Sequence, residues 1–464
     1  MQPHTHNTDN TTHPNSTLPN STQHGFWHTF THRFIGTPPN SDLPNVEENA
    51  GRYSLGFGTQ NIGDQIVSAK TVLPWFLSTV GGPAWAISLL VPIRESGSML
   101  PQAFLRPWLQ SHGTRLPLMI AGSIGQAAAC AVMALTALFA TGTAAALLIL
   151  AALGLLALSR ALVSLTSKDI AGRTIPKGYR GRLTGFATTL SGAVAILVGV
   201  GVQSLHGNLT ATLFSALFAA AGASWLASAV LFRGITEGDV APKKQRAGVW
   251  EDIWDLMVHD RPFRNFVIVR TMLLTSALSP AFLVAMSHNA HVSGAVSNFF
   301  TGLGTFVIAA GVASLMAGRI SGWLADKSSR NTMTWAAVIA STVLAVTVIL
   351  YFVGDATTAT PNQPTTSAYA VFVWWLPVAF FIISLAHVAV RVARSTYVVD
   401  MAEGDQRTRY VSVANTMMGV LLLAVGGITG ALAAAGPEWA LLTLAVCGFA
   451  GAVLATRLPE VSAG

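Results

Sequence analysis

The chain has 464 residues, of which 52% are hydrophobic and only 10% are charged. Soluble globular proteins carry roughly 25% charged residues, so this composition excludes a protein whose surface faces water throughout. The formal net charge is +7, but its distribution along the chain, described below, argues against nucleic acid as a partner. The two cysteines, Cys130 and Cys447, both lie in apolar runs, which argues against a disulfide framework or a cysteine metal site.

Residues 1–50 differ in kind from the rest of the chain. They are rich in Asn, Thr, Pro and Ser, contain six of the twelve histidines and lack the apolar core of a signal peptide. We therefore predict a disordered polar tail. The spacing of its histidines is irregular, so a solvated tail is favoured over a metal site, and metal binding by the tail stays open. The histidines are His4, His6, His13, His24, His28 and His32.

Apolar runs of about twenty residues recur after this tail, each long enough to cross roughly 30 Å of hydrocarbon as a helix. We predict a bundle of six helices in residues 51–232, a cytosolic linker with a short amphipathic helix in 233–262, a second six-helix bundle in 263–457 and a cytosolic tail in 458–464. The predicted spans are 57–80, 84–105, 116–140, 143–165, 183–205, 211–232, 263–287, 294–317, 333–353, 369–392, 411–434 and 438–456.

Lysine and arginine are confined to alternate predicted loops. The loops that contain neither lie near Gly82, Thr141, Gly207, Ser287, Thr358 and Gly436. This asymmetry follows the positive-inside rule and predicts that both termini lie in the cytosol, with the protein in the inner membrane. It also accounts for the basic character of the chain, so we expect no nucleic-acid partner.

The two predicted halves contain matching segments in the same order. Residues 108–115 align without gaps on residues 323–330, and each segment joins the second and third spans of its half. In both halves an arginine then stands nine residues before an aspartate. These pairs are Arg160 with Asp169 and Arg391 with Asp400. Two halves of equal topology indicate a parallel repeat about an axis along the membrane normal.

The segment from Gly322 to Arg330 resembles the loop signature of the major facilitator transporters, at the place of that family's second copy. The first copy is degenerate, because Pro107 replaces its glycine and Ser111 its aspartate. The resemblance implies an all-α membrane protein of about twelve transmembrane helices in two pseudo-symmetric six-helix bundles. Drug antiporters of the family have a glycine- and proline-rich fifth span, whereas residues 185–201 contain glycines and no proline, which argues against an antiporter.

Charged residues of these loops are candidates for a cytosolic gate, since an arginine at one helix end can pair with an acid at another. The repeat predicts that Arg115 faces Asp169 and that Arg330 faces Asp400, while Asp326 caps a neighbouring helix N-terminus. The alternative is that these are ordinary loop charges, which set only the topology.

Charged residues within the spans are candidates for function, because a charge at the bilayer centre costs roughly 2.5–3.5 kcal/mol even on insertion scales. The acids are Asp64 and Glu95, and the cations are Lys70, Arg94 and Arg270. Arg160 and Arg391 lie nearer the cytosolic helix ends, where long side chains can reach the interface.

Lys70 and Arg94 are expected at one depth. Lys70 lies about ten residues before the tight turn at Gly81 and Arg94 about eleven residues after it, so both are roughly 15 Å deep at 1.5 Å per residue. We expect Lys70, Arg94 and Glu95 to meet near the midplane. The excess positive charge there predicts an anionic ligand, and Glu95 and Asp64 are candidates for proton exchange. The alternative is an ion pair that fixes two helices.

The second half is expected to contribute Arg270 and His387 to the substrate site. A hydrogen-bonded structural histidine is the alternative for His387. Since no Gly-rich, lysine-containing ATP-binding motif is present, transport would use an ion gradient or run downhill.

We therefore predict a proton-coupled secondary transporter of a small, anionic organic solute, a monomer in the bilayer with no cofactor and no metal. The alternatives are proton-antiport efflux of hydrophobic or cationic compounds, and a non-transporting sensor or assembly protein on the same scaffold. An enzyme is not expected, because no nucleophile–base set and no paired metal ligands lie at one depth.

Overall fold

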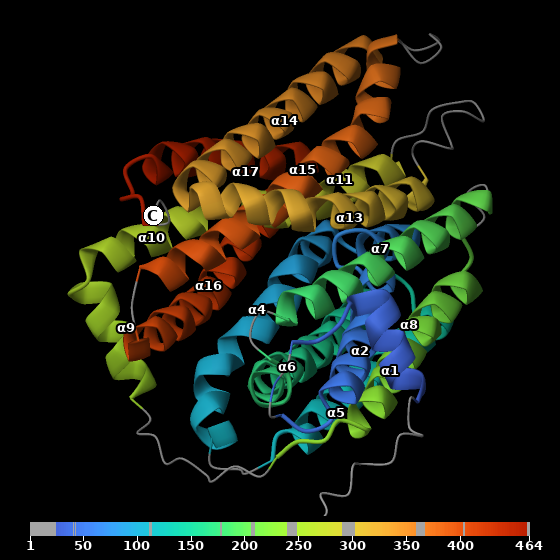
Figure 1. Cartoon of the computed structure of the whole chain (residues 1–464). Coiled ribbons are helices and arrows are strands. Elements are labelled where there is room, and N and C mark those ends of the chain that lie inside the picture. Colours follow the sequence, from blue (N-terminus) through green and yellow to red (C-terminus); the bar gives the residue numbers. More distant parts are fainter. Residues whose placement is uncertain are drawn as a thin grey trace, which may run out of the picture.

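The computed structural model describes residues 25–39, 41, 43–110, 114–176, 179–205, 209–238, 248–289, 302–358, 367–401 and 404–461. Within these ranges the chain forms helices and no strand, and the long helices run side by side in one bundle (Figure 1). Large apolar side chains such as Phe139 and Val230 are exposed on its outer surface, as expected of helices that face lipid.

The helices fall into two sets that follow one another in the chain. The first set is α2 (Val46–Ile66), α3 (Val72–Thr79), α4 (Ala84–Gln110), α5 (Leu116–Phe139), α6 (Gly142–Thr174), α7 (Arg180–Ser204) and α8 (Ala211–Arg233). The second set is α10 (Arg261–Met272), α11 (Thr275–Asn289), α13 (Leu303–Lys327), α14 (Ser329–Thr358), α15 (Ser367–Asp400), α16 (Gly404–Ala433) and α17 (Pro437–Ala455). We call them the N-half and the C-half.

Nine segments in the described part of the chain are long and apolar enough to cross a membrane, which supports a multi-pass membrane protein. The other predicted spans correspond to α2 with α3, to α4, and to α13, whose described apolar stretch is Leu303–Met316. The first of these contain Asp64, Lys70, Arg94 and Glu95, which lower their apolar character. The count of twelve spans stays a prediction.

Corresponding helices of the two halves make corresponding contacts. In the N-half α5 packs against α6 and α8, and in the C-half α14 packs against α15 and α17. Likewise α4 packs against α6, and α13 against α15. Between the halves, α4 packs against α16 and α7 against α13, an exchange of partners that a two-fold repeat along the bundle axis produces.

Glycines allow α7 and α13 to approach closely. A Cβ atom added to Gly304 would lie 2.5 Å from the carbonyl oxygen of Gly199, and one added to Gly311 would lie 2.9 Å from that of Gly192. The two contacts are seven residues apart in each helix, so they fall on one face. The glycines of the fifth predicted span thus serve the contact between the halves.

The prediction of a disordered tail over residues 1–50 is wrong for its last part. Phe26–Phe30 form the short helix α1, and Thr31–Ile35 continue it as a π-helical turn, η1. Phe30 packs edge-on against Phe186 of α7 with ring centroids 5.6 Å apart, and Ile35 is buried. These aromatic and aliphatic side chains anchor a segment whose average composition is polar. Residues 1–24 lie outside the described residues.

The first predicted span, 57–80, is also not one helix, since α2 ends at Ile66 and α3 begins at Val72. Pro74 explains the break, because a proline cannot donate to the carbonyl four residues earlier, here that of Lys70, and its ring clashes with that carbonyl. The Ser68 hydroxyl accepts from the backbone N–H of Lys70 at 3.2 Å, which stabilises the non-helical turn. The seventh span is likewise divided, into α10 and α11.

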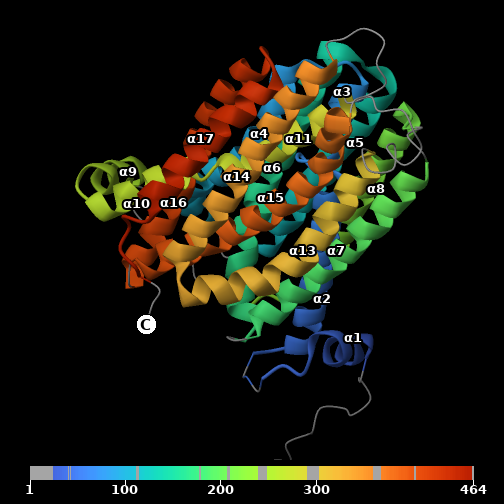
Figure 2. The same ribbon diagram turned by 90° about the horizontal axis from the view of Figure 1, so that it is seen from above.

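The linker between the halves contains α9 (Val249–Val258), an amphipathic helix at the end of the bundle where the described chain begins and ends (Figure 2). Leu256 is buried on one side, whereas Trp250 and Trp254 are each 69% exposed. Arg409 of α16 holds α9 in place by donating to Asp252 at 2.6 Å and Asp255 at 2.7 Å. The hydrogen bond from Arg409 lowers the pKa of Asp255. We call this end of the bundle the terminal end.

Candidate functional site

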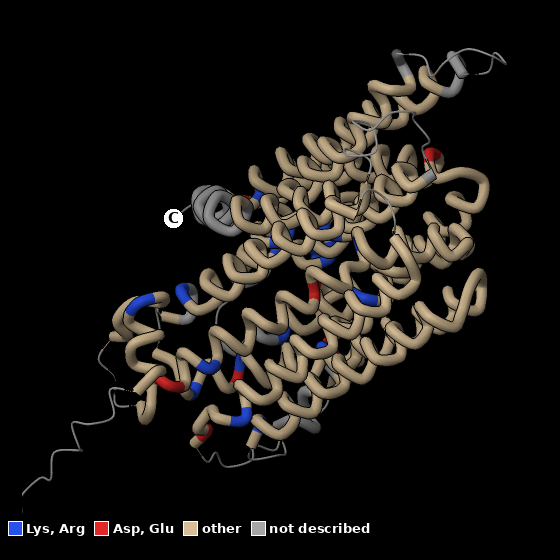
Figure 3. Tube along the Cα trace, turned by 90° about the vertical axis from the view of Figure 1, so that its right-hand side faces the viewer, with Lys and Arg blue, Asp and Glu red and all other residues tan. Residues whose placement is uncertain are grey.

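A cavity of about 550 Å³ lies between the two halves. It is lined by α2, the α2–α3 turn, α4, α6 and α7 of the N-half, and by α11, α13, α15 and α16 of the C-half. It reaches Gln102 of α4 and Lys168 of α6, which are close to the terminal ends of these helices. The charged residues gather toward the terminal end of the bundle, and a second group lies midway along it (Figure 3).

Five of the six residues predicted to bind substrate or protons line this cavity. They are Asp64, Lys70, Arg94, Glu95 and His387. The sixth, Arg270, is only 4% exposed and does not line the cavity. It instead donates to the side-chain oxygen of Asn415 at 3.0 Å, and Asn415 does line the cavity. Arg270 therefore reaches the cavity through Asn415, and its predicted contact with substrate is not supported.

Asp64 accepts from two arginines on neighbouring helices. Arg94 of α4 forms a short ion pair with one carboxylate oxygen, and Arg160 of α6 lies 2.6 Å from the other. The Arg160 guanidinium also donates to Gln60 at 3.2 Å. Arg160 was expected near the cytosolic helix end, where a long side chain can reach the interface, but its guanidinium is inside the bundle at the cavity wall.

Gln60 is the centre of a buried polar network that positions Arg160. Its amide nitrogen donates to Ser123 at 2.8 Å and to Ser228 at 3.0 Å, and its oxygen accepts from Trp225 at 3.1 Å. These partners come from α5 and α8, so the network ties four helices together. A buried polar group satisfied on all sides is rigid, and it fixes the arginine against the cavity.

Glu95 is the second acid of the cavity, and its surroundings are different. In the described part of the chain its carboxylate makes no hydrogen bond and no ion pair within 4 Å. Lys70, Arg94, Arg391 and Arg394 are the charged groups around it. The expected meeting of Lys70, Arg94 and Glu95 is therefore only partly found, because Arg94 turns to Asp64. Lys70 lies in the turn between α2 and α3.

The C-half contributes two basic side chains, His387 and Arg391, to the described cavity wall. His387 is buried, and its Nδ1 lies 3.5 Å from the Ser276 hydroxyl, which is a weak structural contact. Arg391 lines the cavity one helical turn further along α15. The sequence repeat pairs Arg391 with Arg160, so that match was the signal that both arginines have the same position in their halves.

Cations outnumber acids among the described residues of the cavity wall. The cations are Lys70, Arg94, Arg160, Lys168 and Arg391, and the acids are Asp64 and Glu95. Asp64 is already shared by two arginines, so the positive excess is concentrated near Lys70 and Arg391. Fixed positive charge in a partly enclosed cavity attracts anions.

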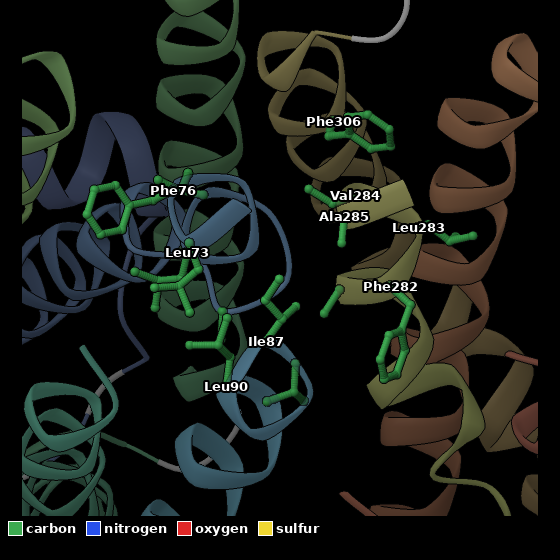
Figure 4. Packing of buried hydrophobic residues seen from close by; sticks show 14 of the residues in the cluster. Leu73, Phe76, Ile87, Leu90, Phe282, Leu283, Val284, Ala285 and Phe306 are labelled. Atoms are coloured by element: carbon green, nitrogen blue, oxygen red, sulfur yellow. The ribbon is translucent and has the colours of Figure 1, made fainter. Parts of the chain in front are cut away.

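Apolar packing closes the cavity at the end opposite the termini. One buried cluster contains Leu73, Phe76, Ile87 and Leu90 of the N-half together with Phe282, Leu283, Val284 and Phe306 of the C-half (Figure 4). His288 of α11 reinforces this closure, since its Nε2 lies 3.1 Å from the Thr79 hydroxyl and its ring packs on Trp75. The buried clusters nearer the terminal end contain residues of only one half each, joined by Leu256 of α9 in one cluster and by Ile35 of η1 in another.

No known family profile matches this sequence, and no curated protein matches it either. Solved structures do match. A D-xylose–proton symporter aligns with a TM-score of 0.65 at 12% identity, over 89% of this chain and 98% of that one. A peptide transporter of the POT family aligns at 0.65 and 10% identity, over 88% and 95%. A nucleoside transporter aligns at 0.64 and 11% identity, over 88% and 99%.

The chain has the major facilitator fold. This supports the all-helical transporter fold implied by the loop signature from Gly322 to Arg330, and the alignments cover 88–89% of this chain. At 10–12% identity the likeness concerns the fold and leaves the ligand open.

In the N-half, a network of charged side chains lies where the loop between α4 and α5 meets α6. Arg115 donates to Asp169 at 2.8 Å, and Asp169 also accepts from Arg173 at 2.8 Å. The buried carboxylate of Glu237 accepts from the backbone N–H groups of Arg115 and Leu116 at 2.8 and 2.9 Å. A carboxylate at this place caps the N-terminus of α5 and opposes its positive helix dipole.

The Arg115–Asp169 pair joins α5 to α6 within one half, so its function as a gate stays a prediction. In the C-half, Arg330 lies 3.7 Å from Glu460 and donates to the carbonyl of Leu458 at 3.3 Å. The side chains of Asp326 and Asp400 lie outside the described residues, so the predicted pairing of Arg330 with Asp400 and the capping by Asp326 also stay predictions.

Proposed function

We propose that this protein is a secondary active transporter that carries a small organic anion together with protons by alternating access. The observation that carries the proposal is the cavity between the halves, with five cations and two acids in its described wall. Its volume of about 550 Å³ is within the range of small-molecule sites. The structural neighbours are a sugar–proton symporter, peptide transporters and a nucleoside transporter, which supports transport in general.

The anionic character of the solute is supported by electrostatics. A positive charge in a partly desolvated site is costly unless a counter-charge is present. Asp64 provides that counter-charge for Arg94 and Arg160, whereas Lys70 and Arg391 have Glu95 as the only other acid of the described wall. An anionic solute between Lys70 and Arg391 would touch both halves at once. Contact with both halves is what a carrier needs to couple binding to their movement.

Proton coupling is assigned to Glu95. When Glu95 is ionised it competes with the solute for Lys70, and when it is protonated that competition ends. The protonated carrier therefore binds the anion more tightly, and by linkage the bound anion favours proton uptake. The two ligands then move in the same direction, which defines a symporter.

A thermal-shift screen of the purified protein tests this function. A ligand that binds only the folded state at about one hundred times its Kd adds about 2.7 kcal/mol of stability. We expect stabilisation by one class of small organic anions, increasing as the pH is lowered, and none by their neutral amides. Lys70→Met should abolish it, whereas Arg457→Met, which removes a positive charge outside the cavity, should not. Stabilisation by organic cations in place of anions would contradict the proposal and support cation efflux.

A further inference from the structure

A second cluster of titratable side chains lies outside the cavity, where the N-terminal segment meets α2. His28 of α1, His32 of η1 and Glu47 in the first turn of α2 place one ligand atom each within 4.8 Å of the others. The Nε2 of His32 is 2.9 Å from Oε1 of Glu47, and the Nε2 of His28 is 3.7 Å from the same oxygen. The two imidazole rings lie side by side, with centroids 4.3 Å apart.

The backbone around this cluster is held in place by its own contacts. The Thr31 hydroxyl donates to the carbonyl oxygen of Glu47 at 2.9 Å, which joins η1 to α2. Arg52 binds Glu48 at 2.8 Å and lies over the ring of Trp27 at 4.8 Å. Arg52 thus pairs with Glu48, whereas the neighbouring Glu47 contacts the two histidines.

A hydroxyl orients one of the two rings. The Thr37 hydroxyl lies 3.3 Å from Nδ1 of His32, on the side of the ring opposite Glu47. When Nδ1 carries the proton and donates to Thr37, the lone pair of Nε2 is directed toward Glu47 and His28. Metal-binding histidines commonly have such an outer partner on the second nitrogen.

We propose that His28, His32 and Glu47 bind a Zn²⁺-type transition-metal ion. In a tetrahedral zinc site with bonds of about 2.0–2.1 Å, neighbouring ligand atoms are about 3.3 Å apart. The two nitrogen–oxygen distances of 2.9 and 3.7 Å lie on either side of this value, and all three ligand atoms lie within 4.8 Å of one another, so side-chain rotations would bring them into place. Water would take the fourth position, because each of the three side chains is about one third exposed.

The ligand set selects the class of ion. Two imidazoles and one carboxylate suit zinc and its neighbours in the first transition series, whereas Mg²⁺ and Ca²⁺ prefer oxygen ligands throughout. Binding would require neutral imidazoles, so protons compete with the ion at acidic pH.

The site has a structural consequence for the carrier. An ion bound here fixes the N-terminal segment to α2, and the same segment already contacts α7. The Tyr179 hydroxyl, next to the start of α7, forms a short hydrogen bond to the carbonyl of Gly36. Burial raises the pKa of Tyr179, which keeps this donor protonated. The metal would thus fasten together α2 and α7, two helices that line the cavity.

Zinc titration of the full-length protein, purified without a histidine tag, tests the site. The background variant replaces His4, His6, His13 and His24 with alanine, so that only the clustered histidines remain in the N-terminal region. Calorimetry should show one Zn²⁺ per chain, and Mg²⁺ at the same concentration should give no binding heat. Zinc should also raise the melting temperature.

Four single variants and one double variant of this background distinguish a built site from scattered surface histidines. His32→Ala and Glu47→Gln should each weaken zinc binding at least about tenfold, and Thr37→Val should weaken it about 10- to 100-fold through the outer contact. His259→Ala removes another surface histidine, 3.1 Å from Asp255, and should leave the affinity unchanged. Melting without zinc shows whether each variant is folded. The proposal is overturned if the background variant binds no zinc, or if a folded His28→Ala, His32→Ala double variant binds as tightly.

Discussion

Asp64 and Glu95 line the same cavity but differ in what surrounds them. Asp64 has an arginine on each carboxylate oxygen, while Glu95 has no partner within 4 Å in the described part of the chain. A carboxylate held by two guanidinium groups holds helices together. A carboxylate open to the cavity can exchange a proton with solvent. The two candidates for proton exchange are thereby separated, with Glu95 favoured.

Replacing Glu95 with Gln tests the coupling, because the variant keeps the shape of the side chain and removes its titration. Accumulation of the anion against its gradient in proteoliposomes should be lost, while exchange of anion across the membrane should continue. The pH dependence of anion binding should disappear as well. A reversed pair, Glu95→Lys with Lys70→Glu, that restores coupled transport would show that the two residues form only a structural ion pair.

Replacing Asp64 with Asn should instead act on stability. It leaves Arg94 and Arg160 without their shared acid, and breaking a buried ion pair typically costs about 3–5 kcal/mol. Chemical or thermal unfolding in detergent measures this loss. Asp255→Asn is a suitable comparison, since Asp255 also has two basic partners, His259 and Arg409, but is exposed on α9, so the loss of stability should be much smaller. Equal losses would contradict a structural function of Asp64.

Sequence depth predicted that Lys70, Arg94 and Glu95 lie at one level, and all three line the cavity, but it did not predict their partners. Arg94 and Glu95 are consecutive, so they point about 100° apart on α4, and only one of them can face a given neighbour. Whether Arg94 or Glu95 faces Asp64 depends on the rotation of α4 and on the position of Arg160. The apolar pattern predicted that Arg160 lies nearer the interface than it does. The repeat contained the missing information, because it assigns Arg160 and Arg391 equivalent positions in the two halves.

At the level of helices, hydropathy predicted where the chain is apolar, but it did not predict where its helical hydrogen bonds stop. The break before α3 follows from Pro74 and from the Ser68 hydroxyl, and a window average of about twenty residues contains neither effect. The same averaging assigned residues 26–36 to a polar tail, although their few aromatic side chains are sufficient to pack on α7. Single residues with strong local effects therefore account for both differences.

The contact between α7 and α13 gives a test at this scale. Gly304→Ala would place a Cβ atom 2.5 Å from the backbone oxygen of Gly199, so the helices must move apart. Overpacking of this kind costs about 1–3 kcal/mol, and a lower melting temperature in detergent is expected. Gly201→Ala is a matched control, because no atom lies within 4 Å of the added Cβ. Equal melting temperatures for the two variants would show that the close approach is unimportant.

For the whole molecule, the composition, the charged loops and the repeat predicted an all-helical membrane protein in two halves, while the count of twelve spans stays a prediction. These sequence features follow from the bilayer and from the two-fold arrangement of the halves, and both of these constrain every helix. The state of the cavity could not be predicted in this way. Its closure at one end depends on contacts such as those of Phe76, Phe282 and Phe306, which are apolar in any arrangement of the halves.

The topology of the whole chain is a prediction that labelling can check. In a variant with Cys130 and Cys447 replaced by alanine, cysteines placed at Thr5 and Ser462 should resist an impermeant thiol reagent in intact cells and react after lysis. A cysteine at Gly207, in a predicted outer loop, should react without lysis and serves as the positive control. Labelling of Thr5→Cys or Ser462→Cys in intact cells would reverse the predicted orientation.

The turn at residues 67–71 has a mechanical consequence. On one side of it α2 is packed on α7 and α8 of its own half, and on the other side α3 is packed on α11 of the opposite half. Lys70 lies between these two rigid segments, where the regular ladder of helical hydrogen bonds is interrupted. A displacement of the Lys70 side chain would therefore change the angle between α2 and α3 and would not have to bend a continuous helix. A solute that binds Lys70, as proposed above, would act next to α3, whose Leu73 and Phe76 belong to the apolar cluster that closes the far end of the cavity.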